Sequence, residues 1–339
     1  MKWRKLGRVF EPDTRVPWMA SHAAMPLAEP VGTHEVRVYF SSRDAAGRAH
    51  TGWCDVDLRK PAAVRRAAEP ILRPGAAGFF DDSGAMLTCL TPADGCTYLY
   101  YIGWNLSRSV PFRNALGLAV RDADGSVRRY ANGPILDRGP HDPCFVSNAC
   151  VRREDGAWRM WYLSGVEWQP RGDRLRHRYH IKHAASSDGI HWEREGIVCI
   201  DFRDDSEYAI SCPWVLRAGN DYRMWYSYRG ESYRIGYAVS SDGLHWERRD
   251  DEAGIDVSPS GWDSAMIEYP HVFDHSGARY LLYNGNDYGK TGFGMAVLEQ
   301  DRPRCPRIRR TVFGTDGTNA DLRSGRVARS TDTIVGWAR

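Results

Sequence analysis

The sequence predicts an all-β protein, a single five-bladed β-propeller with four-stranded blades around a central funnel. A nine-residue phrase occurs twice, 54 residues apart, as Ser-Ser-Asp-Gly-Ile-His-Trp-Glu-Arg at Ser186–Arg194 and as Ser-Ser-Asp-Gly-Leu-His-Trp-Glu-Arg at Ser240–Arg248. A repeat of this period is long enough for one four-stranded sheet with its turns. Short aromatic-rich runs bounded by Gly, Asp and Pro also recur along the chain, and no window shows a sustained helical period. Many short strands at even spacing are typical of a propeller.

Five segments share one order of strands, in which an aromatic-rich second strand precedes a third strand of small and apolar residues. The expected second strands are Val36–Arg43, Tyr98–Asn105, Arg159–Gly165, Arg223–Arg229 and Tyr280–Asn286. The expected third strands include Leu116–Val120, Ile181–Ala185, Ile235–Val239 and Phe293–Val297. We expect residues 1–313 to form the propeller and residues 314–339 to form a C-terminal tail that closes the ring or is partly mobile.

The repeated phrase contains Asp-Gly, a tight-turn dipeptide, followed by a Trp that can pack between neighbouring sheets. We therefore expect each copy to join the third and fourth strands of a blade on its outer side. His191 and His245 are then turn neighbours and not ligands.

Composition excludes several classes of protein. The net charge is +3, and 46 scattered basic residues, all but five of them arginine, are nearly balanced by 43 acids, which does not favour nucleic acid. The N-terminal segment lacks the apolar region of a signal peptide, and no run approaches about 18 apolar residues. The eight cysteines include no C-x-x-C pair and no zinc-like spacing with histidine. We expect a cytoplasmic protein with reduced thiols, no membrane partner, no metal and no cofactor.

A second, less obvious repeat places an aromatic residue before an aspartate at Phe80-Asp81, His141-Asp142 and Trp262-Asp263, with Ser206-Glu207 in the fourth segment. Equivalent positions on first strands form a ring around a propeller axis. We therefore expect Asp81, Asp142, Asp263 and Glu207 to gather at one mouth of the funnel, with Glu268 facing the same axis. Each Asp could instead cap a turn.

Residues near the ends of the second strands should join this mouth, namely Arg43, Trp104, Asn105, Trp168, Arg229, Asn284 and Asn286. Arginines here would hold a carboxylate, a phosphate or a sugar hydroxyl. Alternatively, Arg43 and Arg229 pair with the adjacent Asp44 or with an acid of a neighbouring blade.

Three segments resemble the five-bladed propeller glycosidases, the broad group around glycoside hydrolase families 43, 32 and 130. His141-Asp142-Pro143 is similar to the Asp-Pro segment that carries an active-site aspartate, and Glu268-Tyr269-Pro270-His271 to the Glu-Gly-Pro-His segment that carries the general acid. Phe80-Asp81 resembles an element common in the wider group. The resemblance spans roughly Trp18 to Leu298. It indicates a divergent branch, because the Glu-x-Pro-His segment lies in the last blade and the first blade offers no aspartate.

The resemblance implies a glycoside hydrolase that uses carboxylate acid/base catalysis in the axial funnel on a small-molecule or oligosaccharide substrate. Asp81 would be the base or nucleophile, Asp142 would orient and tune the site, and Glu268 would be the general acid, with Asp263 and Glu207 as alternatives for that role. Substrate-binding residues would be Trp104, Trp168 and Trp262 as stacking platforms, with Arg43, Asn105, Arg229 and Asn286 as polar contacts. The separation of the carboxyl groups would decide between retention and inversion.

Three alternatives stay open at this point. A glycoside phosphorylase needs one carboxylic acid, with arginines to bind the attacking phosphate. A non-catalytic propeller would bind a glycan or a partner without cleaving a bond. A biosynthetic pathway could also have recruited the fold for other chemistry.

Overall fold

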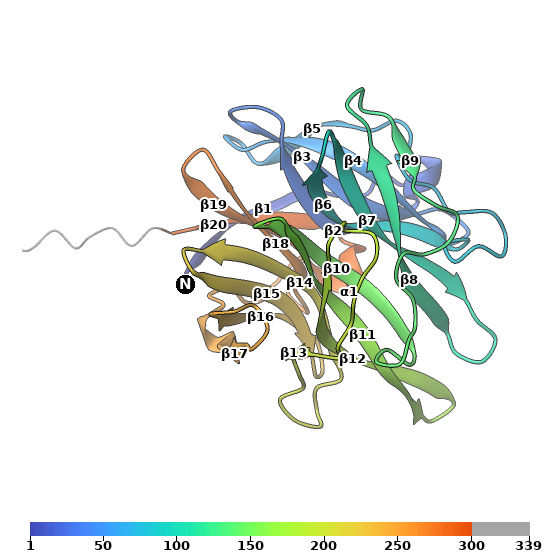
Figure 1. Cartoon of the computed structure of the whole chain (residues 1–339). Coiled ribbons are helices and arrows are strands. Elements are labelled where there is room, and N and C mark those ends of the chain that lie inside the picture. The colour runs from blue at the N-terminus through green and yellow to red at the C-terminus, as the bar shows by residue number, and fades with distance from the viewer. Residues whose placement is uncertain (300–339) are drawn as a thin grey trace, which may run out of the picture. The chain divides into compact units, whose positions relative to one another are not determined.

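The computed structural model describes residues 1–299, which are nearly all β (Figure 1). Among these residues the helical elements are three short segments, η1 (Pro17–Met19), η2 (Asp250–Glu252) and α1 (Asn286–Gly289). None of the helices in this part of the chain is long and apolar enough to cross a membrane. The prediction of an all-β protein is confirmed. The expected boundary at residue 313 and the tail 314–339 lie outside the described residues.

The strands form five four-stranded antiparallel groups, which we call units 1 to 5. Unit 1 contains β2 (Ser21–Pro30), β3 (Glu35–Arg43), β4 (Ala49–Asp57) and β5 (Ala62–Arg66). Unit 2 contains β6 (Gly84–Ala93), β7 (Cys96–Leu106), β8 (Phe112–Arg121) and β9 (Val127–Arg129). Unit 3 contains β10 (Phe145–Glu154), β11 (Ala157–Arg171), β12 (Arg174–Ser186) and β13 (Val198–Ile200).

Unit 4 contains β14 (Ala209–Ala218), β15 (Asp221–Arg229), β16 (Tyr233–Ser240) and β17 (Glu247–Arg248). Unit 5 contains β18 (Glu268–His275), β19 (Ala278–Asn284), β20 (Phe293–Leu298) and, as its outermost strand, β1 (Trp3–Phe10). The predicted second and third strands overlap β3, β7, β11, β15 and β19, and β8, β12, β16 and β20. One prediction runs too long, because β19 ends at Asn284 and the chain then enters α1.

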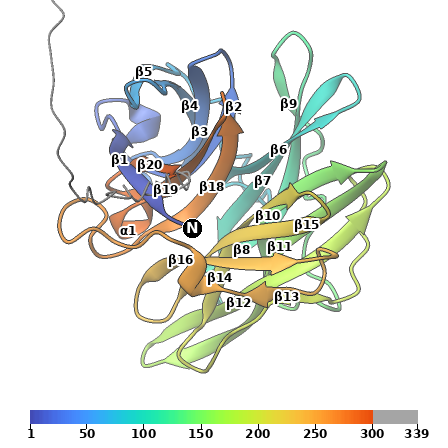
Figure 2. The same cartoon turned by 90° about the vertical axis from the view of Figure 1, so that its left-hand side faces the viewer.

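Neighbouring units contact one another through their first strands. In chain order these strands are β2, β6, β10, β14 and β18; each contacts the next, and β18 also contacts β2 (Figure 2). Single parallel bridges between Ala49 and Gly84 and between Tyr179 and Ala209 connect units 1 and 2 and units 3 and 4. Residues from the first strands of all five units can therefore meet near one line.

The repeated phrase forms the predicted turn between the third and fourth strands of units 3 and 4. In both copies the Asp side chain, Asp188 or Asp242, accepts hydrogen bonds from the backbone N–H groups two and three residues later, at 2.8 and 2.9 Å. The following Trp then packs on the preceding unit: Trp192 contacts Tyr100 edge-on, and Trp246 contacts Trp161. The structural interpretation of the phrase is confirmed.

The first strand in the chain completes the last unit, and Trp3 anchors it. The Trp3 side chain is 7% exposed, packs in a buried cluster with Trp225, and donates from Nε1 to the carbonyl oxygen of Ala253 at 3.0 Å. Closure of unit 5 therefore depends on residues about 250 positions apart in the sequence.

Replacing Trp3 with Ala should lower the free energy of unfolding by about 3–5 kcal/mol, because it empties a buried site and removes the hydrogen bond. Urea unfolding followed by circular dichroism measures this. Tyr130→Ala, at a residue that is 44% exposed, is the control and should change the value by less than about 0.5 kcal/mol. A Trp3→Ala protein as stable as the control would show that β1 is dispensable for closure.

Candidate functional site

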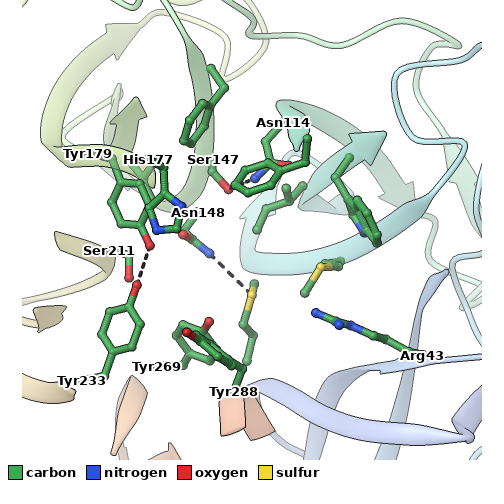
Figure 3. Close-up of a pocket in the computed structure, with 17 residues that line it drawn as sticks. Arg43, Asn114, Ser147, Asn148, His177, Tyr179, Ser211, Tyr233, Tyr269 and Tyr288 are labelled. Atoms are coloured by element: carbon green, nitrogen blue, oxygen red, sulfur yellow. Dashed lines mark hydrogen bonds between the residues drawn. The ribbon is translucent and has the colours of Figure 1, made fainter. Parts of the chain in front are cut away.

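One cavity of about 250 Å³ receives residues from all five units (Figure 3). Its volume is close to the lower end of the range of roughly 300–1,000 Å³ that small-molecule sites occupy. The lining residues are Met25, Arg43, Met86, Ile102, Trp104, Phe112, Asn114, Phe145, Ser147, Asn148, Leu163, His177, Tyr179, Ser211, Tyr233, Tyr269 and Tyr288. Aromatic side chains dominate, and Arg43 is the lining residue with a permanent charge.

Each first strand carries a bulge, which begins at the same place in units 1, 3, 4 and 5 and one residue later in unit 2. At this place one first-strand residue pairs with the second-strand residue that follows an aromatic ring, Phe40, Tyr101, Tyr162, Tyr226 or Tyr283. These five first-strand residues are Ala24, Met86, Ser147, Ser211 and Glu268. Three of them, Met86, Ser147 and Ser211, line the cavity, whereas Ala24 and Glu268 do not. Glu268 is the ionisable member of this set.

Glu268 is fully buried, and within residues 1–299 neither of its carboxyl oxygens has a hydrogen-bond partner. Burial raises the pKa of Glu268 well above its ordinary value, and the nearby charge of Arg229 offsets only part of that effect. The carboxyl is close enough to Tyr179, Tyr233 and Tyr269 for its charge to help raise the pKa of each phenol. All three tyrosines line the cavity, so a carboxyl whose burial favours the protonated form lies next to its wall.

The tyrosines beside Glu268 form part of an ordered aromatic wall. The hydroxyl groups of Tyr179 and Tyr233 are hydrogen-bonded to each other, and the His177 ring stacks on Tyr179 with centroids 4.7 Å apart. Burial, together with the charges of Arg229 and Arg176, lowers the pKa of His177 to about 4, so this imidazole is neutral at pH 7. Sequence reasoning missed these residues, although Tyr179 and Tyr233 are separated by the repeat period of 54 residues.

The repeated aspartates form contacts within their own units. Each accepts a hydrogen bond from a tyrosine 20 residues later: Asp81 from Tyr101 at 3.2 Å, Asp142 from Tyr162 at 3.1 Å, and Asp263 from Tyr283 at 3.1 Å. Each also pairs with a cation on or near the outermost strand of its own unit, at 2.8, 2.8 and 2.7 Å respectively: Arg129, Arg194 and Lys5. These acids tie the start of a unit to its outer edge.

Units 4 and 1 lack an aspartate at this position, and their contacts differ accordingly. In unit 4, Ser206 takes the place of the aspartate, and the hydroxyl of Tyr226 donates to Asp250 instead. Glu207 forms a two-point ion pair with Arg248, at 2.8 and 3.0 Å. In unit 1 the tyrosine is replaced by Phe40, which has no hydroxyl, and the corresponding acid is missing too. None of Asp81, Asp142, Asp263 and Glu207 lines the cavity, so the expected gathering of these acids at the site does not occur.

Among the other predicted residues, Arg43 and Trp104 line the cavity. Trp168 does not line the cavity itself, but its ring contacts two residues that do, Phe112 and His177, with centroids 5.1 and 6.0 Å away. Arg229 also reaches the wall, because its Nη1 donates to the hydroxyl of Tyr288.

The remaining three residues lie elsewhere. Trp262 packs inside unit 5, stacked on Tyr283 with centroids 5.3 Å apart, where it fills space left by Gly285 and Gly294. The side-chain oxygen of Asn286 accepts hydrogen bonds from two backbone N–H groups of the loop before β18. Asn105 is near the end of β7 and does not line the cavity. Within residues 1–299 there is also no group of three His, Cys, Asp or Glu side chains that could hold a metal ion.

Fold and cavity define the class of this protein, an all-β protein with the fold of the propeller glycosidases. The structure of a glycosyl hydrolase from Bacteroides ovatus matches with a TM-score of 0.63 and 15% identity, over 89% of this chain and 94% of the other. A thermostable family-43 glycoside hydrolase matches with a TM-score of 0.60 and 16% identity, over 83% and 91% of the two chains. Identities this low show the fold alone.

The chain belongs to the family of the Mycobacterium tuberculosis protein Rv1502, described as uncharacterized. The two are 44% identical over 300 residues, which are 88% of this chain and all of Rv1502. No family model matches the chain.

Asp142→Asn should lower the free energy of unfolding by about 3 kcal/mol, because it leaves the partly buried Arg194 without a counter-charge. The folded protein should keep the cavity unchanged. Asp155→Asn is the control, since Asp155 is 88% exposed and its ion pair with Arg217 should contribute less than about 1 kcal/mol. Urea unfolding gives both values. An Asp142→Asn protein of normal stability that has lost activity would restore a catalytic role for this residue.

Glu268→Gln should stabilise the protein, and increasingly so as the pH rises. Above about pH 4.5 the unfolded chain releases the Glu268 proton while the folded chain retains it, so the wild type loses stability as pH rises toward the folded pKa. Glutamine removes this dependence, and the difference should grow by up to about 1.4 kcal/mol per pH unit. Unfolding measured from pH 4.5 to pH 8 tests it. The exposed Glu195→Gln is the control, and parallel pH profiles for all three proteins would contradict a protonated Glu268.

Proposed function

We propose that the five units are the blades of a closed five-bladed propeller and that the protein is a glycosidase-like enzyme acting on a glycosidic bond in the axial cavity. Glu268 is the proton donor in this proposal. The observation that carries it is a fully buried carboxyl with a raised pKa beside the cavity wall, for which residues 1–299 offer no hydrogen-bond partner. Cleavage of a glycosidic bond needs a carboxylic acid that is still protonated at neutral pH, and burial provides one.

In the proposed step the carboxyl of Glu268 transfers its proton to the glycosidic oxygen while the bond from that oxygen to the anomeric carbon breaks. The leaving group departs as a neutral alcohol, and Glu268 becomes a carboxylate that regains a proton before the next cycle. Trp104 and the cavity tyrosines offer aromatic faces on which a sugar ring can stack. The neutral His177 can exchange hydrogen bonds with a sugar hydroxyl, since within residues 1–299 its Nε2 has no partner.

The attacking group distinguishes the two enzymatic candidates. Most glycoside hydrolases use a second carboxylate as base or nucleophile, and the residues that line this cavity include no carboxylate. Phosphorolysis needs no such group, because phosphate itself attacks the anomeric carbon and yields a sugar 1-phosphate. Arg43 in the cavity wall favours this second candidate, since a guanidinium binds phosphate at two points.

Two further expectations stay predictions, the cytoplasmic location and the reduced state of the thiols. Within residues 1–299 the seven cysteines are unpaired, which is consistent with reduced thiols. If the protein cleaves no glycosidic bond, the remaining candidate is a non-catalytic propeller that binds a glycan.

Glu268→Gln should lower kcat/KM on aryl glycosides with poor leaving groups by about 10²- to 10⁴-fold, because the proton donor is lost. The loss should shrink on dinitrophenyl glycosides, whose leaving group needs no proton. A panel of aryl glycosides with and without about 10 mM inorganic phosphate measures both the acid role and phosphate dependence. Asp142→Asn, measured per folded protein, is the control and should retain activity. Equal rates for wild type and Glu268→Gln on every substrate would exclude the assignment.

A further inference from the structure

Within residues 1–299 the arginines around the cavity have no acidic partners, whereas many arginines elsewhere form ion pairs. Arg43 lines the cavity, and within residues 1–299 no carboxylate lies within ion-pair distance of its guanidinium. The adjacent Asp44, the partner considered from the sequence, is occupied by Arg48 at 2.9 Å and His50 at 3.1 Å. Arg43 is thus held in the wall without a counter-charge from its own neighbourhood.

Two more guanidinium groups lie behind the opposite wall. Arg176 and Arg229 lie over the ring of Tyr208, at 4.4 and 5.5 Å from its centroid, and both lower the pKa of His177. Their polar contacts are uncharged: Arg176 donates to the side-chain oxygen of Gln169, and Arg229 donates to Tyr288. Aromatic faces stabilise guanidinium groups without neutralising them.

Two carboxyl groups lie in the same region: the buried Glu268, and the exposed Asp287, which adjoins the lining residue Tyr288 and whose charge acts on Glu268. Burial raises the pKa of Glu268 well above its ordinary value, which favours its neutral form, and the cavity-lining residues among residues 1–299 include no acid. The cavity therefore has a positive potential, which favours anionic ligands over neutral ones. Figure 3 shows Arg43 pointing into the cavity from the side of β3, with Tyr179 and Tyr233 on the side of β12 and β16.

From this arrangement we infer that the cavity binds a ligand with an oxyanion group, a carboxylate or a phosphate, held by the guanidinium of Arg43. The inference deepens the proposed function and rests on it for the identity of the substrate as a sugar. Planar guanidinium groups bind such oxyanions through two parallel hydrogen bonds. The group can be a substituent of the sugar or free phosphate that acts as co-substrate. In both cases the anion lies at one side of the cavity and the proton donor at the other.

Equilibrium binding tests this inference without any turnover. The full-length protein is titrated by calorimetry with glucose, glucuronate, glucose 6-phosphate and inorganic phosphate. We expect at least one of the three anions to bind at least about tenfold more tightly than glucose. Arg43→Gln should weaken that binding by about 10- to 100-fold, because charge-assisted hydrogen bonds are lost. Arg128→Gln is the matched control: it removes the same charge from an exposed residue paired with Asp122 on the outer strand of unit 2, and binding should not change.

The pattern of binding distinguishes the sources of the anion. Tight binding of glucuronate or glucose 6-phosphate, with weak binding of phosphate alone, indicates a charged sugar. Tight binding of phosphate alone indicates a co-substrate. Equal affinity for glucose and all three anions, no binding of any anion, or an Arg43→Gln protein that binds like the wild type overturns the inference. Glu268→Gln should bind the anion normally, so loss of turnover in that protein and loss of binding in Arg43→Gln are separate results.

Discussion

The first strand of every unit interrupts its antiparallel ladder with a bulge, and both the fold and the site depend on this bulge. In units 1, 4 and 5 the bulge places an X-Pro pair opposite one second-strand residue, and the first residue of the pair, Met25, Cys212 or Tyr269, has a φ near +50°. Such a conformation costs on the order of 1–3 kcal/mol for a residue other than glycine. Second-strand side chains hold two of these bulges in place: Ser227 accepts from the N–H of Tyr269, and Asn284 from that of Met25, each at 2.8 Å.

The charges discussed above lie in two environments. Asp81, Asp142 and Asp263 lie between a phenol and a cation, where a buried carboxylate is compensated. The cavity keeps the opposite arrangement, with an arginine in its wall and a protonated acid beside it. Unit 1, which has Phe40 in place of the tyrosine, also lacks the aspartate.

The sequence was sufficient for the strands and for the repeated turn, because alternation, aromatic content and Asp-Gly act locally. The sequence also showed that the aspartates recur at equivalent positions of the repeat, but it did not show what they bind. The tyrosine partners lie a constant 20 residues away and could have been found by counting. The cations could not, since Arg129, Arg194 and Lys5 lie 48, 52 and 258 residues from their acids. Only the paired strands bring such residues together, so several carboxylates in register were interpreted as a catalytic cluster.

Glu268 differs from these acids because, within residues 1–299, neither of its carboxyl oxygens has a hydrogen-bond partner. A buried polar group without a hydrogen bond costs free energy, and the fold satisfies every other buried acid discussed above at least in part. The residues equivalent to Glu268 in the other four units are Ser147, Ser211, Met86 and Ala24, so a neutral or apolar residue fits at this position. A carboxyl that stays unpartnered where its equivalents are neutral is expected where its proton is used. The same residue stands first in the Glu-x-Pro-His segment, whose Pro270 belongs to the bulge. The motif and the bulge are thus one feature, which places an acid beside a cavity and keeps it protonated.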